Sequence, residues 1–177
     1  MFGEPAWASL EPFTVLRVLD CDGIEDHHLA GIEKLIHLKY LRLSSRSITE
    51  PPETIGELQY LQTLDVQGTR VKELPLTITK RQQLTHLYVY PNVTFPDGMI
   101  GQMHSLEELS EYEIRSYEQV MSLQDFSKLT RLRTLEIEWN FYLPDVEGTR
   151  QSKDVQTSAS SWSKTAASVR CQNGWTR

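Results

Sequence analysis

Two adjacent histidines, His27 and His28, are the first residues in this sequence whose types suggest a metal site or a general base. Neighbouring residues on a loop point apart, however, and no third ligand stands at a suitable offset from this pair. We therefore expect two surface histidines here and no metal site.

Cys21 is the candidate nucleophile, and it stands between Asp20 and Asp22. Negative charge beside a thiol raises its pKa and so opposes formation of the reactive thiolate. The position of Cys21 in the repeat described below is an inward one, which predicts a small buried side chain. The second cysteine, Cys171, stands 150 positions further along, and no spacing in the chain suggests a zinc site or a disulfide framework.

Acidic side chains could serve in acid–base catalysis, and Glu107-Glu108 and the pair Glu136 and Glu138 lie on or beside predicted strands. The repeat places no histidine or nucleophile with them. The sequence also lacks the pattern G-x-x-x-x-G-K-[ST], whose backbone cradles a nucleoside triphosphate. We expect no enzyme activity, and no catalytic, cofactor-binding or metal-binding residues.

An internal repeat determines which elements position all of these residues. The frame Leu38-x-x-Leu41-x-Leu43 recurs with first leucines at Leu16, Leu61, Leu84, Leu106 and Leu132, and the Leu106 copy is looser. The intervals between successive first leucines are 22, 23, 23, 22 and 26 residues. Self-similarity at this period is the signature of a solenoid, in which stacked coils share one core.

Two shorter periods inside each copy predict the shape of a coil. Apolar residues alternate around Leu41 and Leu43, as in a strand with one buried face. Ahead of the strand the spacing is three, as in Leu29, Ile32 and Leu35, which suits a 3₁₀ turn. The predicted fold is α/β: a leucine-rich-repeat solenoid of about six repeats of 22–26 residues, with a parallel concave sheet and 3₁₀ turns or short helices on the convex side.

The pattern has two local exceptions. Arg81 occupies a position that Leu58 fills one repeat earlier, and its aliphatic stem could cover the core while its charge reaches water. In the fifth copy Glu111 falls where an inward residue belongs. Shifting the frame by one residue makes Tyr112 and Ile114 the inward pair, which predicts a β-bulge rather than a buried glutamate.

The predicted organisation is a lead-in over residues 1–15, a repeat domain over 16–143, and a disordered Ser/Thr-rich tail over 144–177. The formal charge is −6 for the chain and +4 for residues 148–177, so the first 147 residues carry −10. This balance argues against a nucleic-acid partner. No signal peptide or membrane span is apparent, which favours a cytoplasmic protein without a membrane partner. The repeat has no polar caps, so we expect self-association through its ends.

The solvent-facing positions of the predicted strands form the concave surface, where solenoids commonly bind other proteins. The candidate partner-binding residues on this face are Tyr40, Arg42, Asp65, His86, Tyr88, Tyr90, Glu113, Glu136 and Glu138. Tyrosine and arginine are enriched in binding hot spots, because they combine a large contact area with a polar tip. Strand propensity also favours tyrosine at such positions, so the aromatic residues have a purely structural explanation as well.

Four stretches of the chain resemble the leucine-rich-repeat region of plant nucleotide-binding immune receptors, most closely the cereal type. They are residues 13–20 (FTVLRVLD), 36–43 (IHLKYLRL), 61–65 (LQTLD) with 71–75 (VKELP), and 105–109 (SLEEL). The resemblance covers roughly residues 10–140. It implies a truncated receptor that contacts a pathogen protein (an effector) or the nucleotide-binding domain of a receptor. The nucleotide-binding switch and the coiled coil of such receptors are absent from the sequence.

Two other interpretations remain open. The chain could be an intracellular leucine-rich-repeat scaffold or adaptor in signalling, or a truncated gene product without a function of its own. A switch domain encoded upstream of Met1 would favour the receptor interpretation over the scaffold.

Overall fold

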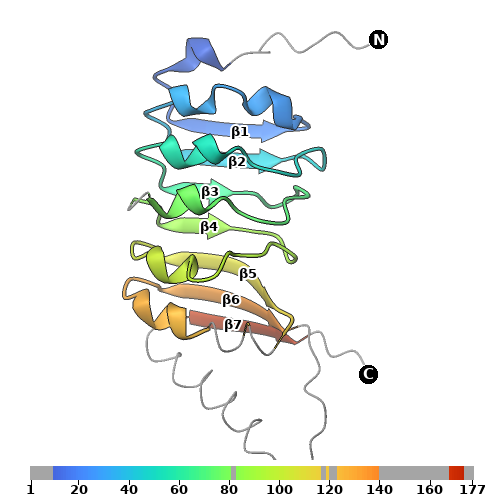
Figure 1. Ribbon diagram of the computed structural model, residues 1–177, viewed down its shortest axis with the longest axis vertical. Helices are drawn as coiled ribbons and strands as arrows, with labels where there is room; N and C mark the ends of the chain where they lie inside the picture. Colours follow the sequence, from blue (N-terminus) through green and yellow to red (C-terminus); the bar gives the residue numbers. More distant parts are fainter. Residues whose placement is uncertain (1–9, 81–82, 117–118, 120–122, 140–167, 174–177) are drawn as a thin grey trace, which may run out of the picture.

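The computed structural model describes residues 10–80, 83–116, 119, 123–139 and 168–173. Within these residues, seven parallel strands form one sheet in the order of the sequence. The strands are β1 (Val18–Asp22), β2 (Tyr40–Ser44), β3 (Thr63–Asp65), β4 (His86–Tyr88), β5 (Glu108–Ile114), β6 (Thr134–Trp139) and β7 (Ser168–Asn173). Figure 1 shows them stacked one above the next along the long axis of the molecule.

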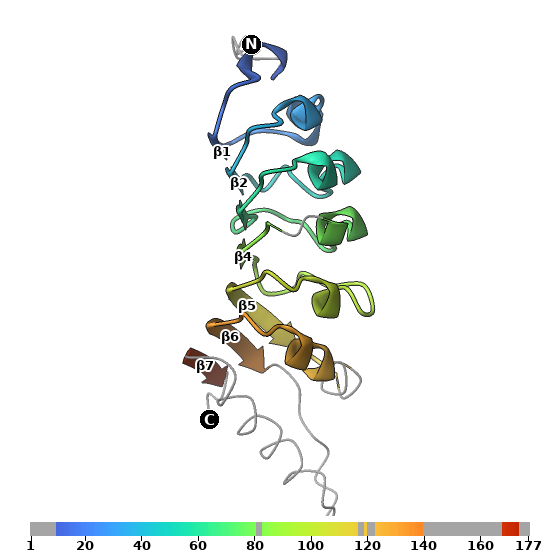
Figure 2. The ribbon, with the colours of Figure 1, turned by 90° about the vertical axis from the view of Figure 1, so that its left-hand side faces the viewer.

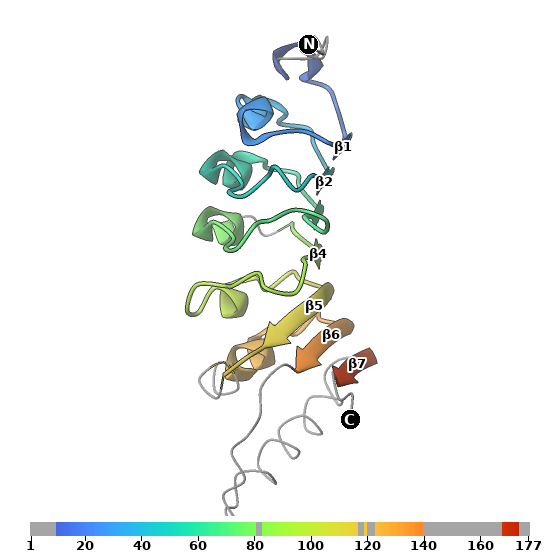
Figure 3. The same cartoon turned by 90° about the vertical axis from the view of Figure 1, so that its right-hand side faces the viewer.

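Between β1 and β6 the return segments contain 3₁₀ turns, as the spacing of three predicts. They are η2 (Asp26–Leu29), η3 (Ile32–Lys34), η4 (Glu53–Glu57), η5 (Leu76–Lys80), η6 (Ile100–Gln102) and η7 (Leu123–Lys128), and a further turn, η1 (Glu11–Phe13), precedes β1. In the two side views the strands line the inner curve of the molecule and the turns line the outer curve (Figures 2 and 3). The predicted leucine-rich-repeat solenoid is confirmed.

The core is a set of leucine ladders that run through all the coils. Parallel register aligns Leu41, Leu64, Leu87, Leu109 and Leu135, and each of these side chains is at most 1% exposed. Burying one such side chain contributes roughly 1.5–3 kcal/mol, and neighbouring coils supply most of the surface that covers it. A coil is therefore stable only inside the stack.

A repeated backbone hydrogen bond sets the spacing between coils at the start of each strand. The carbonyl of Lys39 accepts the N–H groups of Gln62 and Thr63 of the next coil at 2.8 and 2.9 Å. The same arrangement recurs at the carbonyls of Arg17, Gln62, Thr85 and Glu107. Each coil is thereby held in the same register as the previous one, which aligns the outward side chains as well as the inward ones.

The predicted bulge in the fifth coil is confirmed. The register between β5 and β6 shifts between Leu109 and Tyr112, and Glu111 adopts a positive φ of 55°. Tyr112 and Ile114 are buried, at 6% and 0% exposed, and the Tyr112 ring meets Phe126 edge-on. A bulge adds local twist to a strand. Consistently, β5 and β6 run at an angle to β1–β4 in Figures 2 and 3.

The two ends of the chain differ in part from the prediction. Leu10 of the lead-in is buried in the core at 3% exposed, so the lead-in contributes to the first coil. Residues 168–173, within the segment expected to be disordered, form β7 and pair with β6 in unbroken register. The edge of β6 offers unpaired backbone N–H and C=O groups, and pairing with them requires no leucine frame. The repeat pattern in the sequence therefore does not reveal β7. The remainder of the tail and Arg81 lie outside the described residues.

Candidate functional site

Because neighbouring strands pair in the same register, equivalent outward residues line up in rows across the concave sheet. One row runs Asp20, Arg42, Asp65, Tyr88 and Ser110, from β1 to β5. Neighbouring members of a row are about 4.8 Å apart in the backbone, so their side chains touch or share partners. The concave face is therefore a single continuous surface, to which each coil contributes outward residues.

Arg42 links the first three coils through its guanidinium. Its Nη1 lies 3.3 Å from Oδ2 of Asp20, and its Nε lies 3.5 Å from Oδ2 of Asp65. The Asp65 side chain is only 12% exposed, and its Oδ1 accepts the N–H of Gln67 at 2.9 Å. Burial raises the pKa of Asp65, while the Gln67 N–H and Arg42 act in the opposite direction. These contacts give Arg42 and Asp65 a structural role as well as a place on the candidate face.

The aromatic part of the face centres on β4. The rings of His86 and Tyr88 stack at a centroid distance of 6.3 Å, and the Tyr88 hydroxyl donates to Oε2 of Glu108 at 3.2 Å. Burial and the adjacent Glu108 raise the pKa of Tyr88 to about 12, so its hydroxyl remains a donor at neutral pH. Tyr90 is 52% exposed, which leaves its ring available to a partner. Tyr40 belongs to the same surface but lies two strands from His86, with Thr63 between them.

The acidic part of the face surrounds a hollow of about 450 Å³ at the bulge. Tyr90, Pro91, Asn92, Glu111, Glu113, Glu136, Ile137 and Glu138 line it. Glu113 stands directly opposite Glu138 in the register of β5 and β6. Burial raises the pKa of Glu111, and the neighbouring Glu136 and Glu138 raise it further. The bulge thus concentrates like charges at one place on the sheet.

Glu113 was predicted to face solvent, and this prediction is wrong. Its side chain is 5% exposed, because Arg115 folds back over it and forms an ion pair. The same guanidinium donates to the side-chain oxygen of Asn92 in the preceding coil. Burial of Glu113 is therefore compensated by a charge-assisted hydrogen bond.

The sequence pattern missed three residues of this face. Glu108 and Ser110 point outward before the bulge, and Glu111 lines the hollow at the bulge itself. Strand alternation around the inward Leu109 is the signal that assigns Glu108 and Ser110 to the outward face.

The two adjacent histidines lie on one 3₁₀ turn. His27 and His28 lie on η2 with ring centroids 3.9 Å apart, so the expectation that they point apart on a loop is wrong. The Nδ1 atom of His28 accepts the backbone N–H of Glu25, which fixes that ring. Among the described residues, no group of three or more His, Cys, Asp or Glu side chains is suited to a metal ion.

Cys21 is buried, as its inward position predicts, and its thiol is free. Burial raises the pKa of this thiol, and Asp20 raises it further. No helix in the described part of the chain has the length and apolar character needed to cross a bilayer.

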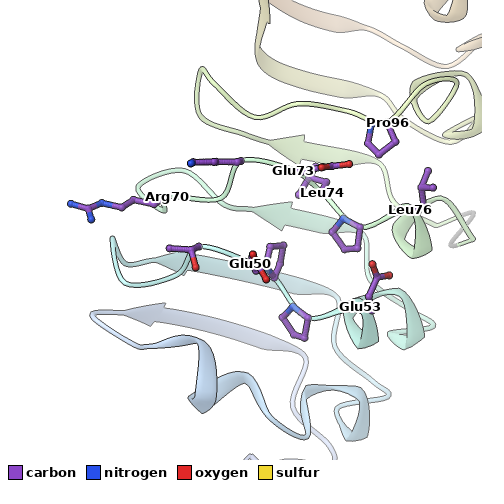
Figure 4. A pocket seen from close by; sticks show the side chains of 12 residues that line it. Glu50, Glu53, Arg70, Glu73, Leu74, Leu76 and Pro96 are labelled. Carbon is purple, nitrogen blue, oxygen red and sulfur yellow. The ribbon is translucent and has the colours of Figure 1, made fainter.

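A second hollow, of about 1050 Å³, lies between the segments that leave β2 and β3. Pro51 and Pro52 form part of its wall, and neither can donate a backbone hydrogen bond to the next coil. In the following interval a backbone bridge joins Glu73 to Thr94. Figure 4 shows Arg70 extending away from the centre of this hollow, with Leu76 and Pro96 at its other end.

Comparison with known proteins agrees with this architecture. The family described as "Leucine-rich repeat region" matches residues 3–164. Among solved structures, internalin C2 of Listeria monocytogenes superposes with a TM-score of 0.60 at 13% identity, over 93% of this chain and 66% of that one. A leucine-rich-repeat protein of Leptospira interrogans gives a TM-score of 0.55 at 22% identity, over 74% of this chain and 46% of that one. At these identities the structural likeness concerns the fold alone.

Sequence relatives extend the likeness to plant disease resistance proteins. Disease resistance protein RGA5 of rice, Oryza sativa subsp. japonica, is 31% identical over 134 residues, which cover 72% of this chain and 12% of RGA5. Disease resistance protein RGA4 of rice is 38% identical over 92 residues, covering 49% of this chain and 9% of RGA4. The chain thus spans about a tenth of the length of these relatives. With its repeat frame, its parallel solenoid and a family match over most of its length, the chain belongs to the leucine-rich repeat region family.

Proposed function

We propose that the chain is a protein-interaction module of plant-immune-receptor type and that it binds through its concave face. The observation that carries this proposal is the continuous outward surface of β2–β6, with tyrosine, histidine and arginine side chains aligned in register. Such residues provide large contact areas with polar tips, as binding hot spots do. The likeness to rice disease resistance proteins supports a role in defence rather than in general scaffolding.

Two kinds of partner fit this proposal. One is a protein made by a pathogen, which the module would sense directly. The other is the nucleotide-binding domain of a receptor, which the module would regulate in signal transduction. Both would engage a surface whose backbone is held in register by the hydrogen bonds between coils.

The matching family is a repeat region and not a catalytic one, which supports binding over catalysis. A cytoplasmic setting remains part of the proposal, and the free thiol of Cys21 is compatible with a reducing compartment. Self-association remains a prediction. It is supported by Leu16 and Leu19, which are only partly buried in the first coil, whereas the equivalent Leu38 and Leu41 are fully buried.

The proposal is tested by affinity purification from plant cells that express the full chain. Three forms are compared: the wild type, the concave variant Tyr88→Ala/Tyr90→Ala, and the matched variant Tyr60→Ala. Tyr60 is a suitable control because it is 42% exposed, stacks on His37 and lies outside the strands, between η4 and β3. A protein that is enriched by the wild type and by Tyr60→Ala, but lost from the concave variant, supports the proposal. Proteins recovered equally with all three forms contradict it.

A further inference from the structure

The two outer strands of the sheet, β1 and β7, each have a neighbouring strand on one side only among the described residues. An outer strand presents a row of backbone N–H and C=O groups that can pair with a strand of another chain. Figure 1 shows these two edges at opposite ends of the stack of coils. The molecule therefore has two different edges to which a further parallel strand can add.

The first coil carries only one half of the backbone contact that joins the later coils. In the third coil, for example, the N–H groups of Gln62 and Thr63 both donate to the carbonyl of Lys39 in the preceding coil. The equivalent N–H groups of the first coil belong to Arg17 and Val18, and no acceptor for them lies within the described part of the chain. The β1 edge thus offers the donors of a contact that recurs in every later coil up to the sixth.

The apolar core at this end is covered less completely beside the strand than beside the turns. Leu16 and Leu19 are only partly buried, whereas Leu10, Ile24 and Leu29 are at most 3% exposed. The lead-in and the turns therefore leave the strand side of the first coil partly open. A parallel strand with an apolar residue opposite Leu19 would complete this side in the way that neighbouring coils do elsewhere in the stack.

β7 provides such a strand at the other end of the molecule. All six strand pairings are parallel, and following them from β1 to β7 places Val169 in the row of Leu19. When β7 of one copy adds to β1 of another in the same register, Val169 stands opposite Leu19 and Arg170 stands opposite Asp20. Opposite charges at neighbouring strand positions attract each other, and the Asp20 side chain is 51% exposed. The two edges are therefore complementary in both apolar character and charge.

We propose that the chain assembles head to tail, with β7 of one copy pairing in parallel with β1 of the next copy. The inference rests on the self-association included in the proposed function, and it specifies the two edges and their register. Contact between two different surfaces leaves one free edge at each end of the assembly, so growth continues beyond a dimer. The concave sheet then runs on from one copy to the next, which lines up the candidate partner-binding faces.

Two cysteines report on this register. Cys21 stands two residues after Leu19 in β1, and Cys171 stands two residues after Val169 in β7. Head-to-tail pairing therefore puts Cys171 of one copy opposite Cys21 of the next, with Cα atoms about 4.8 Å apart. A disulfide spans Cα separations of about 4.4–6.8 Å. Within one copy the two cysteines lie on opposite outer strands of the sheet, so a disulfide between them can form only between copies.

The first experiment mixes two single-cysteine forms of the full chain, Cys21→Ala and Cys171→Ala, and oxidises them with diamide. Diamide takes up the two electrons and two protons that a pair of thiols releases when the disulfide forms. We expect a covalent dimer in the mixture, joining Cys171 of the first form to Cys21 of the second, and at least ~10-fold less dimer from either form alone. A mixture without the dimer, or equal yields from the mixture and from the separate forms, would overturn the inference.

The second experiment blocks the open edge of β1. Val18 is the first residue of this strand, and its N–H is one of the two donors that face away from β2. Val18→Pro removes this donor and leaves the pairing with β2 intact, while the matched control Val18→Thr keeps both the donor and a branched side chain. Circular dichroism checks that both variants are folded, and the cross-linking experiment decides alone if Val18→Pro is not.

Light scattering follows the mean mass of each form as its concentration is raised under reducing conditions. The wild type and Val18→Thr should grow in mean mass, and Val18→Pro should need at least ~10-fold higher concentration to reach the same mass. Equal growth of Val18→Pro and the control, or a wild type that stays monomeric at every concentration, would contradict head-to-tail assembly.

The head-to-tail contact and the concave binding face fail separately. Cross-linking and light scattering use the chain without any partner, and Tyr88→Ala/Tyr90→Ala keeps both outer edges, so it should assemble as the wild type does. If this double variant loses its partner while the cysteine mixture gives no dimer, the concave face stands and the head-to-tail contact is wrong. A dimer in the mixture, together with unchanged partner recovery by the double variant, would have the opposite meaning.

Discussion

Arg42 on β2 and Asp65 on β3 are joined across neighbouring coils, with Nε of Arg42 lying 3.5 Å from Oδ2 of Asp65. The Asp65 side chain is 12% exposed, so few water molecules reach its carboxylate. This guanidinium and the Gln67 N–H stabilise the charged form instead. We predict that Arg42→Gln lowers the free energy of unfolding, because it leaves a nearly buried carboxylate with one partner fewer.

Urea unfolding of the full chain measures this change, and NMR titration should show a further rise in the pKa of Asp65. Arg46→Gln is the matched control, because Arg46 is exposed and its substitution should change stability by less than about 0.5 kcal/mol. Equal stability of the two variants would show that the contact between coils contributes nothing.

Glu111 should make stability depend on pH. Its pKa in the folded protein is raised above the ordinary 4.5, so the folded chain holds this proton more tightly than the unfolded chain does. Protonated Glu111 therefore stabilises the folded chain. This contribution to the free energy of unfolding is fully present below the ordinary pKa and is lost as the pH rises through the raised pKa of the folded protein. Glu111→Gln should therefore be more stable than the wild type at neutral pH, by about 0.2–1 kcal/mol.

This advantage of Glu111→Gln should disappear at about pH 4, where the wild-type carboxyl is also protonated. Thermal unfolding at the two pH values provides the measurement, with Glu57→Gln on η4 as the control for lost surface charge. A constant difference between Glu111→Gln and wild type at both pH values would contradict the electrostatic explanation.

The leucine ladder predicts a sharp contrast between two leucines of neighbouring coils. Leu64 is 0% exposed in the ladder, whereas Leu76 on η5 is 49% exposed. We expect Leu64→Ala to cost about 2–5 kcal/mol, since it removes buried contacts and leaves a cavity. Leu76→Ala should cost less than about 1 kcal/mol. Chemical denaturation tests both, and similar losses would show that the stack is not continuous at Leu64.

Cys21 should be protected from alkylation. It is 7% exposed, and burial together with Asp20 raises its pKa, so little thiolate forms at neutral pH. Iodoacetamide should label the native protein at least ~10-fold more slowly at this position than the urea-unfolded chain. Mass spectrometry of the peptide that contains Cys21 quantifies the rate, and rapid labelling of the native protein would indicate that the first coil is open.

The fold could be predicted from the sequence because a solenoid repeats one physical requirement in every coil. Each leucine of the ladder needs an equivalent partner 22–26 residues away, and this requirement is visible in the spacing of Leu41, Leu64 and Leu87. The bulge was predictable for the same reason. Glu111 breaks the inward pattern and Tyr112 restores it one residue later.

Contacts that depend on polar side chains from different coils could not be predicted in this way. Glu113 occupies an outward position, but Arg115 and Asn92 cover it, and Asn92 belongs to the preceding coil. The contact between His27 and His28 depends on η2 and on the Glu25 backbone N–H, neither of which the leucine frame specifies. The outward residues carry no periodic apolar pattern, so their mutual contacts required the structure.

The measurement that tests the central claim most directly is a calorimetric titration of the partner recovered on the wild-type chain. It compares the wild type, Tyr88→Ala/Tyr90→Ala and Tyr60→Ala, after circular dichroism has shown that all three are folded. Binding through the concave face predicts that the double variant loses at least ~2 kcal/mol, about 30-fold in Kd, while Tyr60→Ala stays within about twofold of the wild type. An unchanged Kd for the double variant would contradict the assignment of the concave face as the binding site.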